Sequence, residues 1–245
     1  MLPDYYPDLT QRPAFVRGLF DRTARHYDHI NRLLSFGSGG WYRRQALLRA
    51  GLRPGMVVLD VAIGTGLVAR QALAITGDSQ AVIGLDISAG MLAEVRRSLG
   101  IPLIQGLMEQ LPVASACCDL VSMGYALRHI TDLNATFREF HRVLRPGGAL
   151  LILEISRPAH PVKRALLKCY LGRLVPLLGW LTTGQRDLQT LMHYYWDTIE
   201  HCIPPETILQ AIRDAGFDGA GCHTEFDLFR AYCGRKRDSV ESGGG

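Results

Sequence analysis

The loop Asp60-Val61-Ala62-Ile63-Gly64-Thr65-Gly66 is the segment whose residue types and spacing point most directly to chemistry. Its glycines permit a tight turn and let a ligand approach the backbone. A helix that starts behind them offers unpaired N–H groups and the positive end of its dipole. Asp86 follows at the end of the next apolar run, where a carboxylate can accept hydrogen bonds from a ribose diol. The pattern predicts a site for a cofactor that carries a nucleoside.

The charge beside this loop distinguishes between two candidate cofactors. The dinucleotide pattern GxGxxG tolerates the alanine found at its third place, Ala69, so the glycines alone do not decide. A carboxylate at Asp60 would repel a pyrophosphate, whereas it suits a ligand with ammonium and sulfonium groups. We therefore expect S-adenosylmethionine rather than NAD. The structural alternative is a glycine-rich turn that binds no ligand.

Strands and helices alternate around the loop. Apolar, β-branched runs predict strands at 56–61, 81–86, 119–123 and 149–155, and the stretches between them predict helices that reach residue 75, span 88–99 and span 132–144. This alternation predicts βαβ units, and hence a mostly parallel sheet with helices on both faces. The fold class is α/β.

The ends of the chain differ from this core. We expect a helical arm over 1–50, a cofactor-binding domain over 51–235 with a helical insertion at about 160–200, and a disordered tail over 236–245. A helix is predicted at 204–215. Strands at 219–223 and 228–234 are spaced for an antiparallel hairpin. Two clusters of basic residues are interpreted as solvated. One is Arg235 to Arg237 at the tail, and the other is Arg142 and Arg145, with Glu139, at the end of a helix.

Composition bounds the class of protein. The chain has 245 residues, 47% of them hydrophobic and 20% charged, with a net charge of +4. Such values exclude a disordered chain, and the mild, dispersed positive charge argues against a nucleic-acid partner. Six cysteines without metal-ligand spacing indicate a reducing, cytoplasmic location and no metal site.

Two longer stretches resemble the signatures of a known family. Phe20-Asp21 with the segment 27–37 forms the first, and 142–148 followed by Leu153-Glu154-Ile155-Ser156 forms the second. Both are similar to class I S-adenosylmethionine-dependent methyltransferases, and more narrowly to the ubiquinone/menaquinone biosynthesis C-methyltransferases (UbiE-type), over residues 15–235. The resemblance implies a Rossmann-like fold with an N-terminal helical lid. It also implies C-methylation of a small hydrophobic aromatic or quinol-like acceptor.

The resemblance also implies which residues bind the cofactor. These are Tyr27, Asp60, Gly64, Thr65, Gly66, Asp86, Ile87, Met91, Met108 and Glu109. Tyr27 would belong to the lid, and Asp86 would hold the ribose hydroxyls. Leu107 stands where the family has an acid beside the adenine, so backbone groups or Glu109 would take over that contact.

On the acceptor side, the resemblance places Arg128 toward the substrate. We expect Arg128 to stabilise an oxyanion and the adjacent His129 to act as a base, with Tyr125, Tyr194 and Tyr195 contacting the substrate. The alternatives are an ion pair between Arg128 and Asp132, a surface or capping role for His129, and core packing for the aromatic run 192–196.

Several alternatives for function and partners stay open. The chain could be an O- or N-methyltransferase of a specialised metabolite, a non-catalytic protein that binds the cofactor or a partner, or an NAD-dependent oxidoreductase. The segment Ala165 to Leu181 is apolar with interspersed basic residues. It is either a peripheral contact for a prenyl tail or membrane surface, or a helix that covers the domain. The resemblance also suggests a homodimer.

Overall fold

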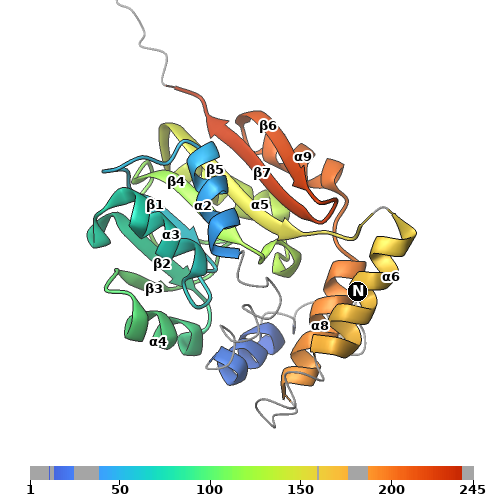
Figure 1. Ribbon diagram of the computed structural model, residues 1–245. Helices are drawn as coiled ribbons and strands as arrows, with labels where there is room; N and C mark the ends of the chain where they lie inside the picture. The colour runs from blue at the N-terminus through green and yellow to red at the C-terminus, as the bar shows by residue number, and fades with distance from the viewer. Residues whose placement is uncertain (1–10, 12–13, 25–38, 159, 176–186, 239–245) are drawn as a thin grey trace, which may run out of the picture.

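Apolar runs of the sequence form one seven-stranded sheet at the centre of the molecule (Figure 1). The computed structural model describes residues 11, 14–24, 39–158, 160–175 and 187–238. The strand order is β3-β2-β1-β4-β5-β7-β6. The strands are β1 (Val58–Val61), β2 (Val82–Asp86), β3 (Leu103–Gln105), β4 (Cys118–Gly124), β5 (Leu144–Ile155), β6 (Phe217–Glu225) and β7 (Phe229–Lys236).

The sheet is parallel from β3 to β5, while β7 pairs antiparallel with both β5 and β6. This topology confirms the predicted α/β class and the C-terminal hairpin. The short edge strand β3 was not predicted, because three residues after a proline are too few to show a strand periodicity.

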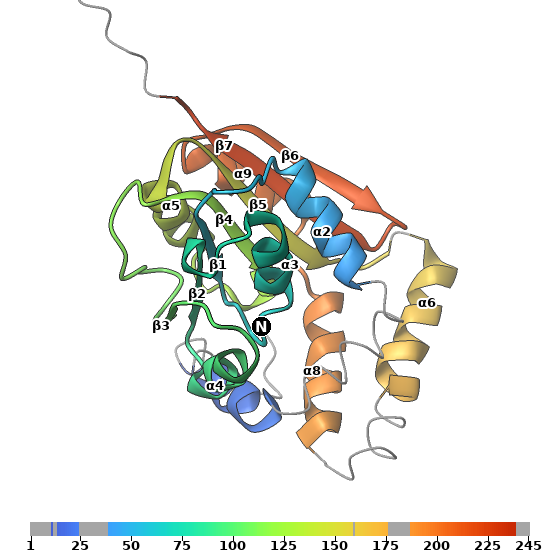
Figure 2. The same ribbon diagram turned by 60° about the vertical axis from the view of Figure 1, so that its left-hand side comes forward.

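Helices cover both faces of the sheet (Figure 2). The described helices are α2 (Gly39–Arg49), α3 (Leu67–Thr76), α4 (Ala89–Ser98), α5 (Leu133–Val143), α6 (Pro161–Cys169), α8 (Asp187–Glu200) and α9 (Pro205–Asp214), together with a helix over residues 14–24. Of these, α2, α3 and α4 pack on one face of the sheet, and α5 and α9 pack on the other. A π-helical turn, η4 (Tyr170–Leu174), extends α6. In both ribbon views α6 and α8 lie together to one side of the sheet.

Alternating side chains of the central strands supply two separate cores. On β5, Leu150 and Ile152 pack into the core that includes α5 and α9, whereas Leu151 and Leu153 pack into the core that includes α2, α3 and α4. A strand buried on both faces must be apolar almost throughout, which is the pattern that the sequence shows here. The two cores fix the carboxyl ends of β1, β2 and β4 at one edge of the sheet.

The basic residues at the end of β7 are not a solvated tail. Lys236 donates hydrogen bonds from Nζ to the carbonyl oxygens of His141 (2.7 Å) and Leu144 (2.8 Å), and Arg235 donates to those of Gly147 and Ala50. Carbonyl groups at the end of a helix or in a turn often lack backbone partners, and here the two cations donate to them. The strand therefore continues one residue into the predicted tail. Residues 239–245 lie outside the described part of the chain.

The helix end at Arg142 is also engaged rather than solvated. The Arg142 guanidinium bonds both oxygens of Glu139 and the carbonyl oxygens of Leu111 and Val113, and Glu139 accepts a hydrogen bond from the backbone N–H of Leu111 at 2.7 Å. Glu139 and Arg142 thus hold the loop before β4 against α5.

We expect Arg142→Ala to lower the free energy of unfolding by about 2 kcal/mol, because it leaves buried carbonyl oxygens without donors. Arg138→Ala is the matched control, since Arg138 is exposed on the same helix, and it should change stability by less than about 0.5 kcal/mol. Urea unfolding of both variants measures the difference. Equal effects would contradict the role given to Arg142.

Candidate functional site

The carboxylate of Asp60 ties three elements together beneath the glycine loop. It is 1% exposed at the end of β1. It accepts a hydrogen bond from the Ser122 hydroxyl on β4 at 2.6 Å and another from the Ala69 backbone N–H on α3 at 3.0 Å. A buried carboxylate needs such donors to offset its lost hydration. Asp60 thereby fixes where α3 begins relative to β1 and β4.

Two glycines give the loop its shape. Gly64 and Gly66 have φ angles of +56° and +84°, in the left-handed region that side chains disfavour. A Cβ atom on Gly66 would lie 2.8 Å from the Leu99 side chain, so packing also requires glycine there. A Cβ atom on Gly64 would meet nothing within 4 Å. Its backbone is therefore open to a ligand.

Asp86 closes the loop from the neighbouring strand. Its two oxygens accept hydrogen bonds from the backbone N–H groups of Gly64 (2.8 Å) and Ser88 (2.9 Å). Ser88 in turn caps α4, as its sequence position predicts, by accepting a hydrogen bond from the Met91 N–H. Asp86 thus brings the N-terminal ends of α3 and α4 close together. The positive ends of both helix dipoles therefore lie near its carboxylate.

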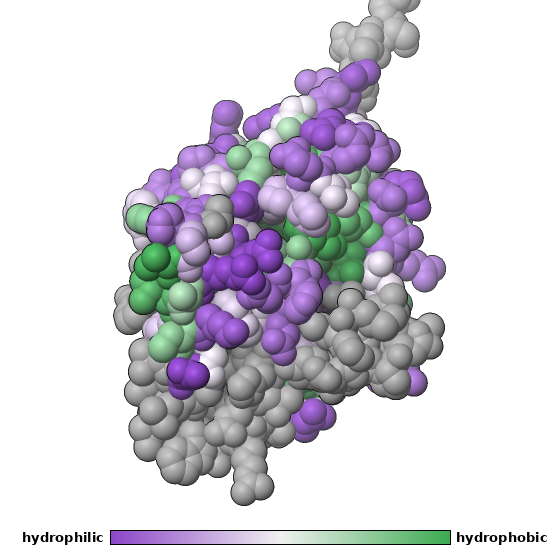
Figure 3. Space-filling model, turned by 90° about the vertical axis from the view of Figure 1, so that its right-hand side faces the viewer, coloured by the Kyte–Doolittle hydropathy of each residue, from purple (hydrophilic) through white to green (hydrophobic). Residues whose placement is uncertain are grey.

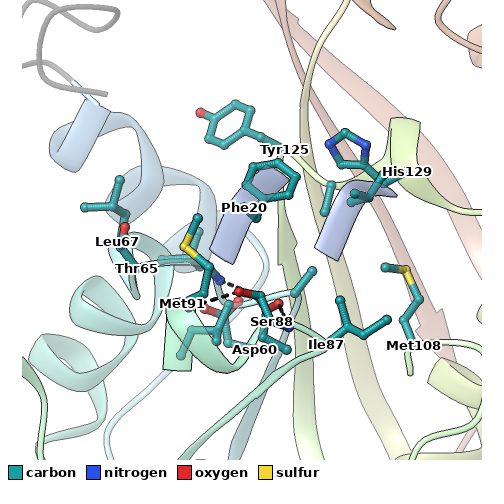
Figure 4. A pocket seen from close by; sticks show the side chains of 18 of the residues that line it. Phe20, Asp60, Thr65, Leu67, Ile87, Ser88, Met91, Met108, Tyr125 and His129 are labelled. Carbon is teal, nitrogen blue, oxygen red and sulfur yellow. Dashed lines mark hydrogen bonds between the residues drawn. The ribbon is translucent and has the colours of Figure 1, made fainter. Parts of the chain in front are cut away.

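A pocket with about 750 Å³ of free space opens above these carboxylates (Figure 4). A second hollow of about 490 Å³ shares several of its residues and continues toward Leu107 and Glu109. Nine predicted residues line the larger pocket, namely Asp60, Gly64, Thr65, Asp86, Ile87, Met91, Met108, Tyr125 and His129. Glu109 lines the second, Gly66 lies at the start of α3, and Tyr27 lies outside the described residues.

The helix over residues 14–24 lies against this pocket. Val16 and Phe20 line it, and Oδ1 of Asp21 accepts hydrogen bonds from the Ser88 hydroxyl (2.5 Å) and the Gly90 backbone N–H (2.9 Å). Asp21 therefore joins the helix to the first turn of α4, where a negative charge is favoured. These contacts hold the helix over residues 14–24 against the pocket.

Burial raises the pKa of both pocket carboxyls. Desolvation raises the pKa of Asp60 to about 7 and that of Asp86 to about 6, although hydrogen bonds to each carboxylate oppose the shift. A cation in the pocket would favour the ionised forms. The two acids are therefore poised to respond to a positively charged ligand.

Arg43 is a buried cation that the sequence reasoning missed. It projects from α2 into the pocket, is 6% exposed, and lies over the Tyr125 ring with its Cζ 5.2 Å from the centroid. Among the described residues its Nε has no hydrogen-bond partner, and no carboxylate lies within ion-pair distance. Nothing in the local sequence distinguishes it from Arg44, because only the α2 packing selects which arginine faces inward.

The pocket therefore fits the predicted cofactor on three independent counts. The carboxylates suit an ammonium group and a ribose diol, the left-handed glycine loop admits a ligand to its backbone, and Arg43 offers a buried positive charge that suits a carboxylate. S-adenosylmethionine carries all of these groups, and its adenine would reach the apolar hollow near Met108.

His129 lies at the acceptor end of the pocket. Its Nδ1 is 3.1 Å from the Tyr194 hydroxyl, its ring stacks on that of Tyr194, and Phe20 meets it edge-on at 5.5 Å. Tyr194 is fully buried and lines neither hollow. In this structure Tyr194, a predicted substrate contact, instead contacts and orients His129.

Arg128 and Tyr195, which were predicted to face the acceptor, pack against each other beside the pocket. Arg128 lines neither hollow. Its side chain is 2% exposed, lies 3.4 Å from Glu154, donates to the Tyr125 carbonyl oxygen at 3.1 Å and covers the Tyr195 ring at 4.4 Å. The buried charge of Arg128 is balanced by Glu154 on β5, not by Asp132. The pair instead fixes Tyr125, whose φ of +61° is unusual for a tyrosine.

The raised pKa of Asp60 predicts how the stability of the ligand-free protein depends on pH. Between its usual value of 3.8 and about 7, the folded protein retains a proton that the unfolded chain has released. The free energy of unfolding should therefore fall as pH rises through this range. Asp60→Asn should flatten the dependence. Urea unfolding between about pH 4 and about pH 8 measures it, and an unchanged slope in the variant would contradict the assignment.

Comparison with known proteins agrees with this site. Residues 9–226 match the sequence model of the ubiE/COQ5 methyltransferase family. The chain is 34% identical over 218 residues to the ubiquinone/menaquinone biosynthesis C-methyltransferase UbiE of Shewanella oneidensis, covering 86% of each protein. A second UbiE, from Shewanella baltica, is 33% identical over 218 residues and again covers 86% of each protein.

Solved structures share the fold. An S-adenosylmethionine-dependent methyltransferase from Aquifex aeolicus superposes with a TM-score of 0.58 at 15% identity, over 79% of this chain and 88% of that one. The identity to the UbiE proteins, the family match and the pocket together overturn the NAD alternative. This chain belongs to the ubiE/COQ5 methyltransferase family and is an S-adenosylmethionine-dependent methyltransferase.

Proposed function

We propose that the protein methylates a ring carbon of a small, hydrophobic, quinol-like acceptor. The observation that carries this proposal is the continuity of the pocket, in which the carboxylates of Asp60 and Asp86 and the aromatic side chains of Phe20 and Tyr125 line one space. Flat aromatic molecules suit a site lined by aromatic and thioether side chains. The relatives named as UbiE support a quinone-type acceptor.

The chain's own residues have two tasks in such a reaction. S-adenosylmethionine, when bound, supplies a methyl group already activated by its positive sulfur. The protein must align the acceptor with that group and exclude water, which the lid residues Val16 and Phe20 are placed to do. It must also favour the deprotonated hydroxyl of the acceptor, because an oxyanion raises the electron density of the ring carbon.

We assign the proton-accepting role to His129. It lines both hollows, and the Tyr194 hydroxyl and Phe20 hold its ring in place. Arg128 is a positioning residue in this account, since it holds the Tyr125 carbonyl and pairs with Glu154 rather than facing the acceptor.

Incubation of the enzyme with isotopically labelled S-adenosylmethionine and a reduced, short-chain quinol tests the proposal. The expected product carries the label on a ring carbon, as NMR and mass spectrometry would show. A labelled methyl group on oxygen would instead show that the reaction is O-methylation. Saturable cofactor binding without transfer to quinols, catechols or amines would contradict the proposed function and favour a non-catalytic binding protein.

Arg43→Gln should weaken S-adenosylmethionine binding about tenfold or more, because it removes a buried charge-assisted hydrogen bond to the cofactor carboxylate. The matched control is Arg44→Gln on the same helix, which should leave the dissociation constant within about twofold. Calorimetric titration measures both. An unchanged affinity in Arg43→Gln would exclude Arg43 from the cofactor site.

His129→Asn should lower kcat about 100-fold while leaving S-adenosylmethionine affinity unchanged, because a general base typically contributes that much. The acidic limb of the pH–rate profile should disappear in the variant. Tyr194→Phe should shift that limb with a smaller loss of rate. If His129→Asn kept the profile of the parent enzyme, another group would be the base.

A further inference from the structure

The outer face of α6 is apolar and unusually exposed. Val162 and Leu166 are 59% and 66% exposed, and no residue of this helix is buried. With the exposed Cys169 they recur at four- and three-residue steps, so they form one strip along the helix. The opposite face packs against α8, where Leu167 and Tyr170 lie against Trp196 and Ile199. The strip therefore points away from the rest of the protein.

The charges of α6 are all positive and flank this strip. The helical period places Lys163 on one side of the strip and Lys168 on the other, and the helix contains no acidic residue. Arg164 points toward α8, where it pairs with Glu200. An apolar strip between lysines is the pattern of a helix that lies in a membrane interface, with its aliphatic side chains among acyl groups and its ammonium groups among phosphates.

A second element extends the same surface. Phe226, in the turn between β6 and β7, is 81% exposed. The adjacent Asp227 lies 3.5 Å from the backbone N–H of His160, which caps α6. Phe226 is thus held beside the first turn of the helix. Figure 3, which looks onto the side where α6 lies, shows hydrophobic surface at the left edge of the view directly beside hydrophilic surface.

We propose that the strip Val162–Leu166–Cys169, with Phe226 and the flanking lysines, docks on an anionic lipid bilayer. Charge complementarity favours this occupant over a second copy of the chain, because a symmetric contact between two such faces would bring their lysines together. In the described part of the chain no helix is long and apolar enough to cross a membrane.

This inference extends the proposed function but does not depend on it. A hydrophobic quinol with a long tail resides in a bilayer, so an enzyme that meets the bilayer surface would gain access to it. The turn that carries Phe226 leads into Phe229 of β7, which pairs with Ile155 at the carboxyl end of β5. The pocket also lies at the carboxyl ends of its strands. The docking surface and the pocket thus belong to the same edge of the sheet.

Co-sedimentation of the full chain with lipid vesicles tests the proposal. The protein should bind vesicles that contain phosphatidylglycerol more tightly than vesicles of phosphatidylcholine alone, and added salt should weaken the binding. Val162→Ser with Leu166→Ser should lower the partition coefficient at least tenfold. Lys163→Gln with Lys168→Gln should lower the partition coefficient by roughly 25-fold, because each lysine contributes a factor of about five.

Two matched controls separate the surface from general effects. Leu48→Ser removes an exposed leucine on α2, and Arg53→Gln with Arg96→Gln removes equal charge elsewhere. Both should bind as the parent does. All variants should retain cofactor affinity and turnover of a water-soluble acceptor, so a failure of the methylation assay would leave the vesicle result readable.

Three outcomes would overturn the proposal. The first is no binding to anionic vesicles. The second is equal weakening by the α6 variants and their controls. The third is a dimer in solution that Val162→Ser with Leu166→Ser dissociates, because the face would then be an interface between copies of the chain.

Discussion

Two carboxylates buried at the ends of neighbouring strands are the constraint on which the rest of the site depends. Asp60 and Asp86 lie at the carboxyl ends of β1 and β2, with almost no exposed surface. Their burial is tolerated because each accepts hydrogen bonds from the backbone or hydroxyl groups around it. The same hydrogen bonds shape the glycine loop and set where α3 and α4 begin. The acids that we propose to bind the cofactor therefore also build the walls of the pocket.

The remaining parts of the pocket supply what the carboxylates lack. Arg43 on α2 brings a positive charge to the pocket. Among the described residues, no other arginine or lysine lines it. Asp21 joins the lid helix to α4 through Ser88, a residue that also bonds Asp86. The lid and the cofactor acids thus share one hydrogen-bonded group.

The sequence was most informative where one short segment determines both structure and chemistry. The loop at Asp60, the acid at Asp86 and the alternation of strands could be read directly, because each depends on local backbone geometry or burial. Arg128 and Tyr194 do not line the pocket, because a motif identifies a position but not the direction of its side chain. Glu154 directs the side chain of Arg128, and His129 contacts that of Tyr194. In each pair the two residues lie on different elements of the fold. Arg43 was missed for the same reason, and β3 because it is only three residues long.

The most direct test of this account is the number of protons exchanged when S-adenosylmethionine binds. Calorimetric titration near pH 6.5, in buffers of different ionisation enthalpy, measures this number. The account predicts net proton release, because Asp60 and Asp86 are partly protonated in the free protein, with pKa values of about 7 and about 6, and ionise beside a cationic ligand. Asp60→Asn should release fewer protons. Binding without proton release, or with net uptake, would contradict the claim that buried carboxylates recognise the cofactor.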